Sequence, residues 1–219
     1  MGLNRLRKHP DYDINVLAVI SEESMIPLCE KYNVSWVMHE NQPLGAKKNF
    51  GISEAMKKEF DYLIEIGSDD VLKNEYLEVI SPYLGVNNLI GIDHAAYINA
   101  ATGACRYIKS KTSFGMGRAV RKSALEKVGK MWSNKQNKGM DKHSTFTMAQ
   151  AGVLERRISS DLPLGIDIKS DVNIWGWRDI KMLTRPYSLD KALDGLSKEE
   201  INAIQCLITK NKSASLIGA

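Results

Sequence analysis

Cysteine is scarce in this chain. Its 219 residues include three cysteines, Cys29, Cys105 and Cys206, which lie far apart and form no CxxC pair. An odd, widely spaced set argues against both a disulfide framework and a thiolate zinc site. A reducing compartment suits such a chain, and we expect a cytoplasmic protein.

Long hydrophobic runs are missing as well. No segment approaches the roughly 20 apolar residues that a membrane-spanning helix needs. The first residues, MGLNRLRKHPDYD, contain no apolar signal core, and Leu6 stands where a myristoylation motif requires Ser or Thr. We therefore expect no membrane span, no secretory signal and no N-terminal lipid anchor.

Charge of one sign is only slightly in excess. Thirty Lys and Arg against 26 Asp and Glu give a formal net charge of +4. This excess suits an anionic small molecule but falls short of a nucleic-acid-binding surface, so we expect no nucleic-acid partner. With 43% hydrophobic residues, the chain can bury the core of a compact domain.

Short apolar runs alternate with amphipathic segments in the first third of the chain. The expected strands are Ile14–Ile20, Ser35–Met38 and Tyr62–Ile66, and the expected helices cover Glu22–Tyr32 and a segment from Ala46. This order predicts an α/β fold with a mostly parallel central sheet and helices on both faces. A hairpin-like pair of strands around Asn99–Gly103 predicts an antiparallel edge.

The end of the chain has its own pattern. Ser197–Glu200, SKEE, is a capping box, and Ile201, Ile204, Leu207 and Ile208 after it give the apolar stripe of a helix. We therefore expect one domain over residues 1–188 and a helical extension over residues 189–219.

The most informative stretch is DYLIEIGSDD, residues 61–70, in which an apolar strand runs into two adjacent carboxylates. Gly67 and Ser68 end the strand, so Asp69 and Asp70 should lie at its carboxyl end, where open α/β sheets bind ligands. Neighbouring carboxylates repel each other, and Mg²⁺ or Mn²⁺ would relieve that repulsion. The alternative is an Asp pair that turns the chain and caps the next helix.

Two further segments are candidates for this site. PLGAKKN, Pro43–Asn49, would offer backbone N–H groups and lysines to a phosphate at a helix start, although such lysines often only face solvent. Asp141, at another expected helix start, is a candidate general base, with a helix cap as the alternative. Three tryptophans could offer an aromatic face to a sugar ring or could simply pack in the core or at its rim: Trp132, Trp175 and Trp177.

NQPLGAKKNFGISEAMKKEFDYLIEIGSDDVL, Asn41–Leu72, resembles the core signature of family 2 glycosyltransferases of the GT-A fold. In that family an N.G.a.aRN.G...a helix precedes a strand ending in D.DD. Gly115–Arg118 and GMDKHS, Gly139–Ser144, are similar to its acceptor-side glycine segment and its acidic catalytic motif. The resemblance implies a GT-A-like three-layer sandwich that transfers a sugar from a nucleotide-sugar donor to a carbohydrate or other hydroxyl acceptor.

The resemblance also implies roles for single residues. Asp69 and Asp70 would hold Mg²⁺ or Mn²⁺ on the diphosphate, and Asp141 would deprotonate the acceptor hydroxyl for direct, inverting displacement. The contacts to nucleotide and donor would come from Ser21, Glu22, Lys48, Asn49, Ser68 and Asp69. A metal and lysines would stabilise the charge of the departing nucleoside diphosphate.

The chain departs from the family pattern in three places. Gly67 replaces the first Asp of D.DD, and Met140 replaces the first acid of the catalytic motif. The family's first strand, with its Pro-Tyr-Asn-like loop, has no counterpart before Pro10. We therefore expect either a chain that starts inside the fold or direct pairing of the strands Ile14–Ile20 and Tyr62–Ile66.

Two other functions stay open. The first is a catalytically weak or inactive GT-A-like domain that binds a nucleotide or a partner protein, which the departures favour. The second is a nucleotidyltransferase, which would share a metal and phosphate site. That class should show a glycine-rich and basic loop after the first strand, and this sequence has none.

Overall fold

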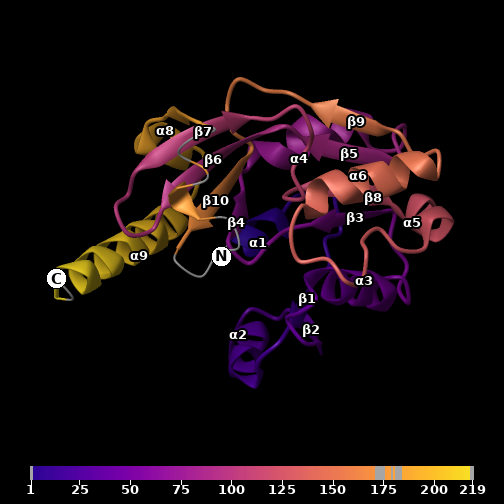
Figure 1. The fold of residues 1–219 in the computed structure, drawn as a ribbon, viewed down its shortest axis with the longest axis horizontal. Helices are drawn as coiled ribbons and strands as arrows, with labels where there is room; N and C mark the ends of the chain where they lie inside the picture. The colour runs from indigo at the N-terminus through magenta and orange to yellow at the C-terminus, as the bar shows by residue number, and fades with distance from the viewer. Residues whose placement is uncertain (1, 171–175, 179, 181–183, 218–219) are drawn as a thin grey trace.

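The computed structural model describes residues 2–170, 176–178, 180 and 184–217 and has a mixed α/β architecture (Figure 1). Its strands are β1 (Leu17–Ile20), β2 (Ser35–Met38), β3 (Tyr62–Glu65), β4 (Asp70–Leu72), β5 (Leu89–Ile92), β6 (His94–Asn99), β7 (Cys105–Lys109), β8 (Arg118–Arg121), β9 (Glu155–Ile158), β10 (Gly165–Lys169) and β11 (Arg185–Pro186). Its helices are α1 (Gly2–Leu6), α2 (Ile26–Lys31), α3 (Leu44–Ala55), α4 (Glu75–Ile80), α5 (Lys122–Val128), α6 (Met140–Gln150), α8 (Leu189–Leu193) and α9 (Lys198–Ile217). The predicted α/β class is confirmed.

The strands form three sheets. Their orders are β1-β2, β11-β7-β6-β10-β4 and β3-β8-β5-β9. The pairs β1–β2, β5–β9 and β6–β10 are parallel, and the other pairs are antiparallel. The predicted hairpin is confirmed as β6–β7. Antiparallel pairing extends beyond the edge that the sequence indicates, because β4 and β8 run against their neighbours.

The sheet β3-β8-β5-β9 is covered by helices on both faces. Successive residues of a strand point to opposite faces, and in β5 Leu89 packs with Met140 and Met148 of α6 whereas Ile90 packs with Tyr76 of α4. Figure 1 shows α6 crossing in front of β8. This helix–sheet–helix layering is the three-layer arrangement that the resemblance implies.

The C-terminal helices cover the five-stranded sheet. Ala96 and Ile98 of β6 and Ile166 of β10 pack against Ala192 of α8 and Ile204 of α9. Figure 1 shows α9 running outward from this sheet. The segment predicted as a helical extension therefore contains two helices, α8 and α9, separated by residues 194–197, and both contribute side chains to the core of this sheet.

The strands β1 and β3 do not pair with each other. Among the described residues β1 pairs with β2 and β3 pairs with β8, so the direct pairing that we offered as one of two expectations is wrong. Helix α3 packs against both the β1-β2 sheet and the β3-β8-β5-β9 sheet. Ile52 of α3 belongs to the same core cluster as Leu89 of β5, and a Cβ added at Gly51 would lie 2.6 Å from Val19 Cγ2 of β1. Figure 1 shows β1, β2 and α2 set apart from the larger sheets.

The first helix and the first strand predicted after Pro10 have different bounds in the structure, for local reasons. The helix expected over Glu22–Tyr32 is a short 3-10 turn, Glu23–Met25, followed by α2. Pro27 sits in the first turn of α2, where its missing N–H is tolerated, so the regular helix starts only at Ile26. The first strand is shorter than predicted, because Ile14 packs against the core instead of joining β1.

The predicted capping box at the start of α9 is confirmed. Ser197 N donates to Glu200 Oε2 at 2.9 Å, and Glu200 N donates to Ser197 Oγ at 3.2 Å. Arg5 Nε lies 3.1 Å from Glu200 Oε2 and ties α1 to α9. Burial alone would raise the pKa of Glu200, but the bonds from Ser197 and Arg5 outweigh it and lower the pKa.

We expect Glu200→Gln to lower the free energy of unfolding by about 1 kcal/mol at pH 7, because it weakens the cap and the ion pair. A lowered folded pKa stabilises the protein above the ordinary value of 4.5, so the deficit should shrink as the pH falls below that value. Urea unfolding at pH 7 and pH 3.5 measures it. Glu199→Gln, an exposed neighbour in the same turn, is the control, and an equal loss there would contradict the prediction.

Candidate functional site

The Asp69–Asp70 pair lies at the junction of the two larger sheets. β3 ends at Glu65 and β4 begins at Asp70, so the pair follows the carboxyl end of β3 as predicted. The helix-cap alternative is wrong, because the next element is a strand and the N-cap of α4 is Asn74. The two carboxylates therefore have another local role or a ligand.

Both carboxylates fold back over Gly67. Gly67 N donates to Asp70 Oδ2 at 2.8 Å. A Cβ added at Gly67 would lie 2.6 Å from Asp70 Oδ2 and 2.9 Å from Asp69 Oδ1. A side chain at this position would push the pair away, so the glycine that breaks the D.DD pattern is part of the geometry of this turn. Ser68 lies exposed in the same turn.

Strand β10 adds two charged residues that sequence reasoning missed. Asp167 pairs with Asp70 of β4 on one side and with Tyr97 of β6 on the other. Lys169, two residues further on the same face, has its Nζ 2.7 Å from Asp167 Oδ2 and 3.6 Å from Asp69 Oδ2. The polar residues alternate with apolar ones in GIDIK, Gly165–Lys169, which is the signal that could have marked them.

Burial and mutual repulsion perturb these carboxyl groups. Burial raises the pKa of Asp70 to about 8, and the charges of Asp167 and Asp69 add to the effect. Burial also raises the pKa of Asp167 to about 7, although Lys169 opposes it. The protein's own cations therefore do not balance the carboxylates here.

Asp141 reaches the same neighbourhood from α6. A Cβ added at Gly115 would lie 2.6 Å from Asp141 Oδ1 and 3.5 Å from Glu65 Oε1, so both carboxylates flank the Gly115 backbone. Asp141 is in the first turn of α6, but its N-cap is Gly139. Burial raises the pKa of Tyr97, and the charges of Asp167, Asp70, Asp141 and Asp69 add to the effect. Asp141 and the Asp69–Asp70 pair therefore act on the same buried side chain, that of Tyr97.

Arg118 anchors the turn that carries Asp141. Its side chain is fully buried and donates to Ser144 Oγ, to Ser113 Oγ at 3.3 Å, and to Asp141 O and Thr145 Oγ1 at 3.4 Å. These acceptors belong to α6 and to the segment before Gly115. Arg118 therefore holds α6 against β8, a role that its sequence motif did not reveal.

The lysines of α3 face the site, but the helix N-terminus does not. Lys48 pairs with Glu65 and lies 4.9 Å from the centre of the Trp132 ring. Burial alone would lower the pKa of Lys48, but Glu65 and Asp141 outweigh it and raise the pKa. Lys47 donates to Ser21 Oγ at 2.8 Å, which places Ser21 beside α3. Glu22 next to it is exposed.

The expected phosphate cradle at the start of α3 is wrong, because its backbone donors are already occupied. Leu44 N donates to Asn137 Oδ1 at 2.7 Å, and Gly45 N donates to Gln136 O at 2.9 Å. The Asn49 amide is used in the same way, since its Nδ2 donates to Trp132 O at 2.7 Å. The segment around residues 132–137 therefore packs directly on this helix end.

The chemistry of the carboxylate cluster fits a hard divalent cation. Carboxylate oxygens are the ligands that Mg²⁺ and Mn²⁺ prefer, and Asp167 Oδ1 is buried with no hydrogen-bond partner among the described residues. In the described ranges no three His, Cys, Asp or Glu side chains are already placed to hold a metal ion. The Lys169 ammonium lies within 4 Å of two of the carboxylates.

The other candidates are placed as follows. Trp132 is buried in the core cluster that includes Leu89 and Met140, Trp177 packs against the separate cluster that includes Tyr76 and Ile90, and Trp175 lies outside the described residues. All three cysteines are free. In the part of the chain that the structure covers, no helix is long and apolar enough to cross a membrane.

Comparison with known proteins places this architecture. No protein-family model and no curated protein matches the chain. S. aureus TarS (residues 1–349) superimposes with a TM-score of 0.52 and 14% identity, covering 95% of this chain and 66% of the TarS chain, so the chain spans just under two thirds of that structure. The chain therefore shares the fold of TarS over most of its length.

Two further solved structures match less well. A197 from STIV gives a TM-score of 0.42 at 11% identity and covers 67% of this chain and 83% of its own. A protein from Desulfovibrio desulfuricans G20, named as a nucleotide-diphospho-sugar transferase, gives a TM-score of 0.46 at 12% identity and covers 95% and 82%.

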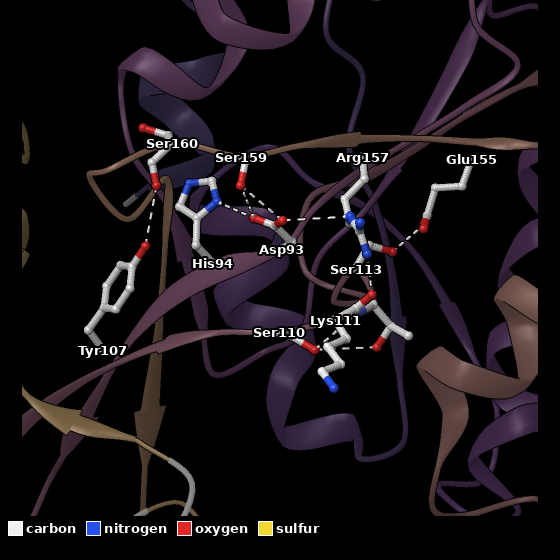
Figure 2. Close-up of polar contacts among 11 residues, drawn as sticks. Asp93, His94, Tyr107, Ser110, Lys111, Ser113, Glu155, Arg157, Ser159 and Ser160 are labelled. Atoms are coloured by element: carbon white, nitrogen blue, oxygen red, sulfur yellow. Dashed lines mark hydrogen bonds and ion pairs between the residues drawn. The ribbon is translucent and has the colours of Figure 1, made fainter.

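A second polar cluster lies between the β5–β6 junction and the end of β9 (Figure 2). Asp93 accepts from Ser159 Oγ at 3.0 and 3.1 Å, and it lies 3.1 Å from His94 Nδ1 and 3.7 Å from Arg157 Nε. Because Ser159 contacts the carboxylate and not the imidazole, this set lacks the nucleophile–base contact of an acyl-transfer triad. It ties the end of β9 to the β5–β6 junction.

We expect Asp70→Asn to stabilise the protein by about 2 kcal/mol at pH 8 and by little at pH 4. Because the folded-state pKa of Asp70 is raised to about 8 from the ordinary 3.8, the folded protein retains a proton that the unfolded chain releases in this window. Stability of the unmodified protein should therefore fall as the pH rises from 4 to 8. Thermal unfolding across this pH range measures the effect, and the exposed Asp61→Asn variant is the control. If both variants change stability alike, the assignment is contradicted.

Arg118→Ala should lower the free energy of unfolding by about 3 kcal/mol, because it removes a buried side chain together with its hydrogen bonds to α6 and to Ser113. Arg121→Ala on the same strand is the matched control. That half-buried side chain donates to Tyr62 Oη alone at 3.1 Å, and we expect a loss of about 1 kcal/mol. Urea denaturation of both variants makes the comparison, and equal losses would show that Arg118 is no anchor.

Proposed function

We propose that this protein is a family 2-like glycosyltransferase that moves a sugar from a nucleotide-sugar donor to a hydroxyl acceptor with inversion. One observation carries the proposal: Asp141 and the Asp69–Asp70 pair, about 70 residues apart in the sequence, all contribute to raising the pKa of the buried Tyr97 side chain. The glycosyltransferase-like fold shared with TarS supports it.

The side chains suit the chemical step. Asp141 beside the Gly115 backbone would accept the proton of the acceptor hydroxyl, since a general base needs only hydrogen-bond reach of it. Lys48, whose raised pKa keeps it charged, would face the negative charge that builds on the leaving diphosphate. Asp69 and Asp70 would hold Mg²⁺ or Mn²⁺, which when bound neutralises the leaving group.

The remaining assigned residues would bind the donor. Ser21 and Glu22 beside α3 would contact the nucleotide, and exposed Ser68 would contact the donor next to Asp69. Asn49 would act indirectly, because its amide holds the segment at Trp132 in place. The acceptor would approach from the Gly115 side, where Asp141 lies.

A second candidate function is nucleotide or protein binding without turnover. The observation that favours it is the occupied start of α3, where Leu44 N and Gly45 N donate to the chain's own Asn137 and Gln136. These donors are not free for a phosphate. In that case the Asp69–Asp70 pair would bind a nucleotide, and Asp141 would have no acceptor to activate.

The first test is thermal shift against a panel of nucleoside diphosphates with and without Mn²⁺, followed by donor hydrolysis and transfer assays. We expect Mn²⁺-dependent stabilisation that Asp70→Asn abolishes. Asp141→Asn should spare binding and lower turnover by at least about a hundredfold, because it removes the general base. Asp61→Asn is the control for both.

The outcomes separate the two functions. Binding without hydrolysis or transfer would favour the second candidate. If no nucleoside diphosphate stabilises the protein in the presence of Mn²⁺, or if both site variants bind and turn over normally, the proposed site is misplaced.

A further inference from the structure

Lys169 is a buried ammonium group inside the carboxylate cluster. Its side chain is 8% exposed and Asp167 beside it is 13% exposed. The Lys169 Nζ lies 2.7 Å from Asp167 Oδ2 and 3.6 Å from Asp69 Oδ2, so one cation spans carboxylates from β10 and from the turn before β4. This is the contact pattern of a bound cation, made by the chain itself.

The charges do not balance with Lys169 alone. The Lys169 ammonium contacts Asp69 and Asp167, and Asp70 is the strand partner of Asp167, so when all three carboxylates are ionised the group keeps a formal charge of −2. Asp167 Oδ1, the oxygen for which no contact to Lys169 is seen, is buried without a hydrogen-bond partner among the described residues. Buried charged oxygens without partners are costly, so this atom is a free ligand position.

We propose that Asp167 is a third carboxylate ligand of the divalent-cation site, and that Lys169 is an internal cation which the divalent ion must displace. The inference rests on the cation site of the proposed function, and it adds two residues that neither the family motifs nor the fold assigns. Asp167 pairs with Asp70 in the β4–β10 register, so its carboxylate projects on the same side of the sheet.

Lys169 is suited to give way. An ammonium on a flexible four-carbon stem leaves a contact by rotating its own side chain, while the β10 backbone stays paired with β6 and β4. A divalent ion attracts the three carboxylates more strongly than the single charge of Lys169 and repels that ammonium. Lys169 therefore fills the site before cation binding and competes with the cation for it.

The test is direct titration with Mn²⁺ alone, with free Mn²⁺ followed by electron paramagnetic resonance, so that it needs no nucleotide and no activity. We expect Lys169→Met to tighten Mn²⁺ binding by about tenfold, because the competing charge is gone. Asp167→Asn should weaken it by about tenfold, because a charged ligand is lost. Lys169→Gln is the second variant should the Met variant fail to fold, as judged by circular dichroism.

Matched controls lie at the opposite end of β3. Lys122→Met removes a lysine that pairs with Glu59, and Asp61→Asn removes an exposed carboxylate, so neither should change Mn²⁺ affinity. Unchanged or weaker binding by the Lys169 variants, or unchanged binding by Asp167→Asn, overturns the proposal. The proposal is also overturned if neither the unmodified protein nor the Lys169 variants bind Mn²⁺.

The two proposals fail separately. If Mn²⁺ follows the expected pattern but no nucleoside diphosphate binds, the cation site stands and the glycosyltransferase function falls. If sugar transfer requires Mn²⁺ while Asp167 and Lys169 variants bind it like the unmodified protein, the function stands and the assignment of these two residues is wrong.

Discussion

The repulsion among buried carboxylates at the junction of the two larger sheets is the constraint on which this structure depends. Asp69 and Asp70 end the link from β3 to β4, and β10 brings Asp167 opposite Asp70. Burial raises the pKa of Asp70 to about 8 and that of Asp167 to about 7. Lys169 offsets part of the charge. A fold that holds such a cluster without neutralising it gives up stability, and in the proposed function this loss serves the binding of a cation.

The surrounding elements fix the geometry of this cluster. Gly67 lets both carboxylates fold over the backbone, Arg118 holds the first turn of α6, and the Asp93 network in Figure 2 secures the chain ahead of β10. Asp141 therefore stands at a fixed place near the cluster although it belongs to another layer. The β1-β2 sheet is not fixed to the cluster in this way, because among the described residues β1 does not pair with β3. The segment around residues 132–137 contacts the start of α3, the helix that lies beside this sheet.

Much of this could be predicted from sequence, where local pattern decides the outcome. The strand before the Asp pair, the hairpin β6–β7 and the capping box of α9 follow from periodicity and turn chemistry. Asp167 and Lys169 could not be predicted as site residues, because only the register of β10 against β4 places them at the site. The backbone N–H groups of Leu44 and Gly45 were predicted to be available to a phosphate for a similar reason. Their acceptors come from a segment about 90 residues away in the sequence.

The central claim is that the carboxylates at this junction bind a divalent cation that serves a nucleotide-sugar donor. Anomalous diffraction from crystals grown with Mn²⁺ and a nucleoside diphosphate tests it most directly. We predict an anomalous peak among Asp69, Asp70 and Asp167, with the Lys169 ammonium turned away and the diphosphate against the metal. A metal or nucleotide bound elsewhere, with Lys169 still paired to Asp167, would contradict it.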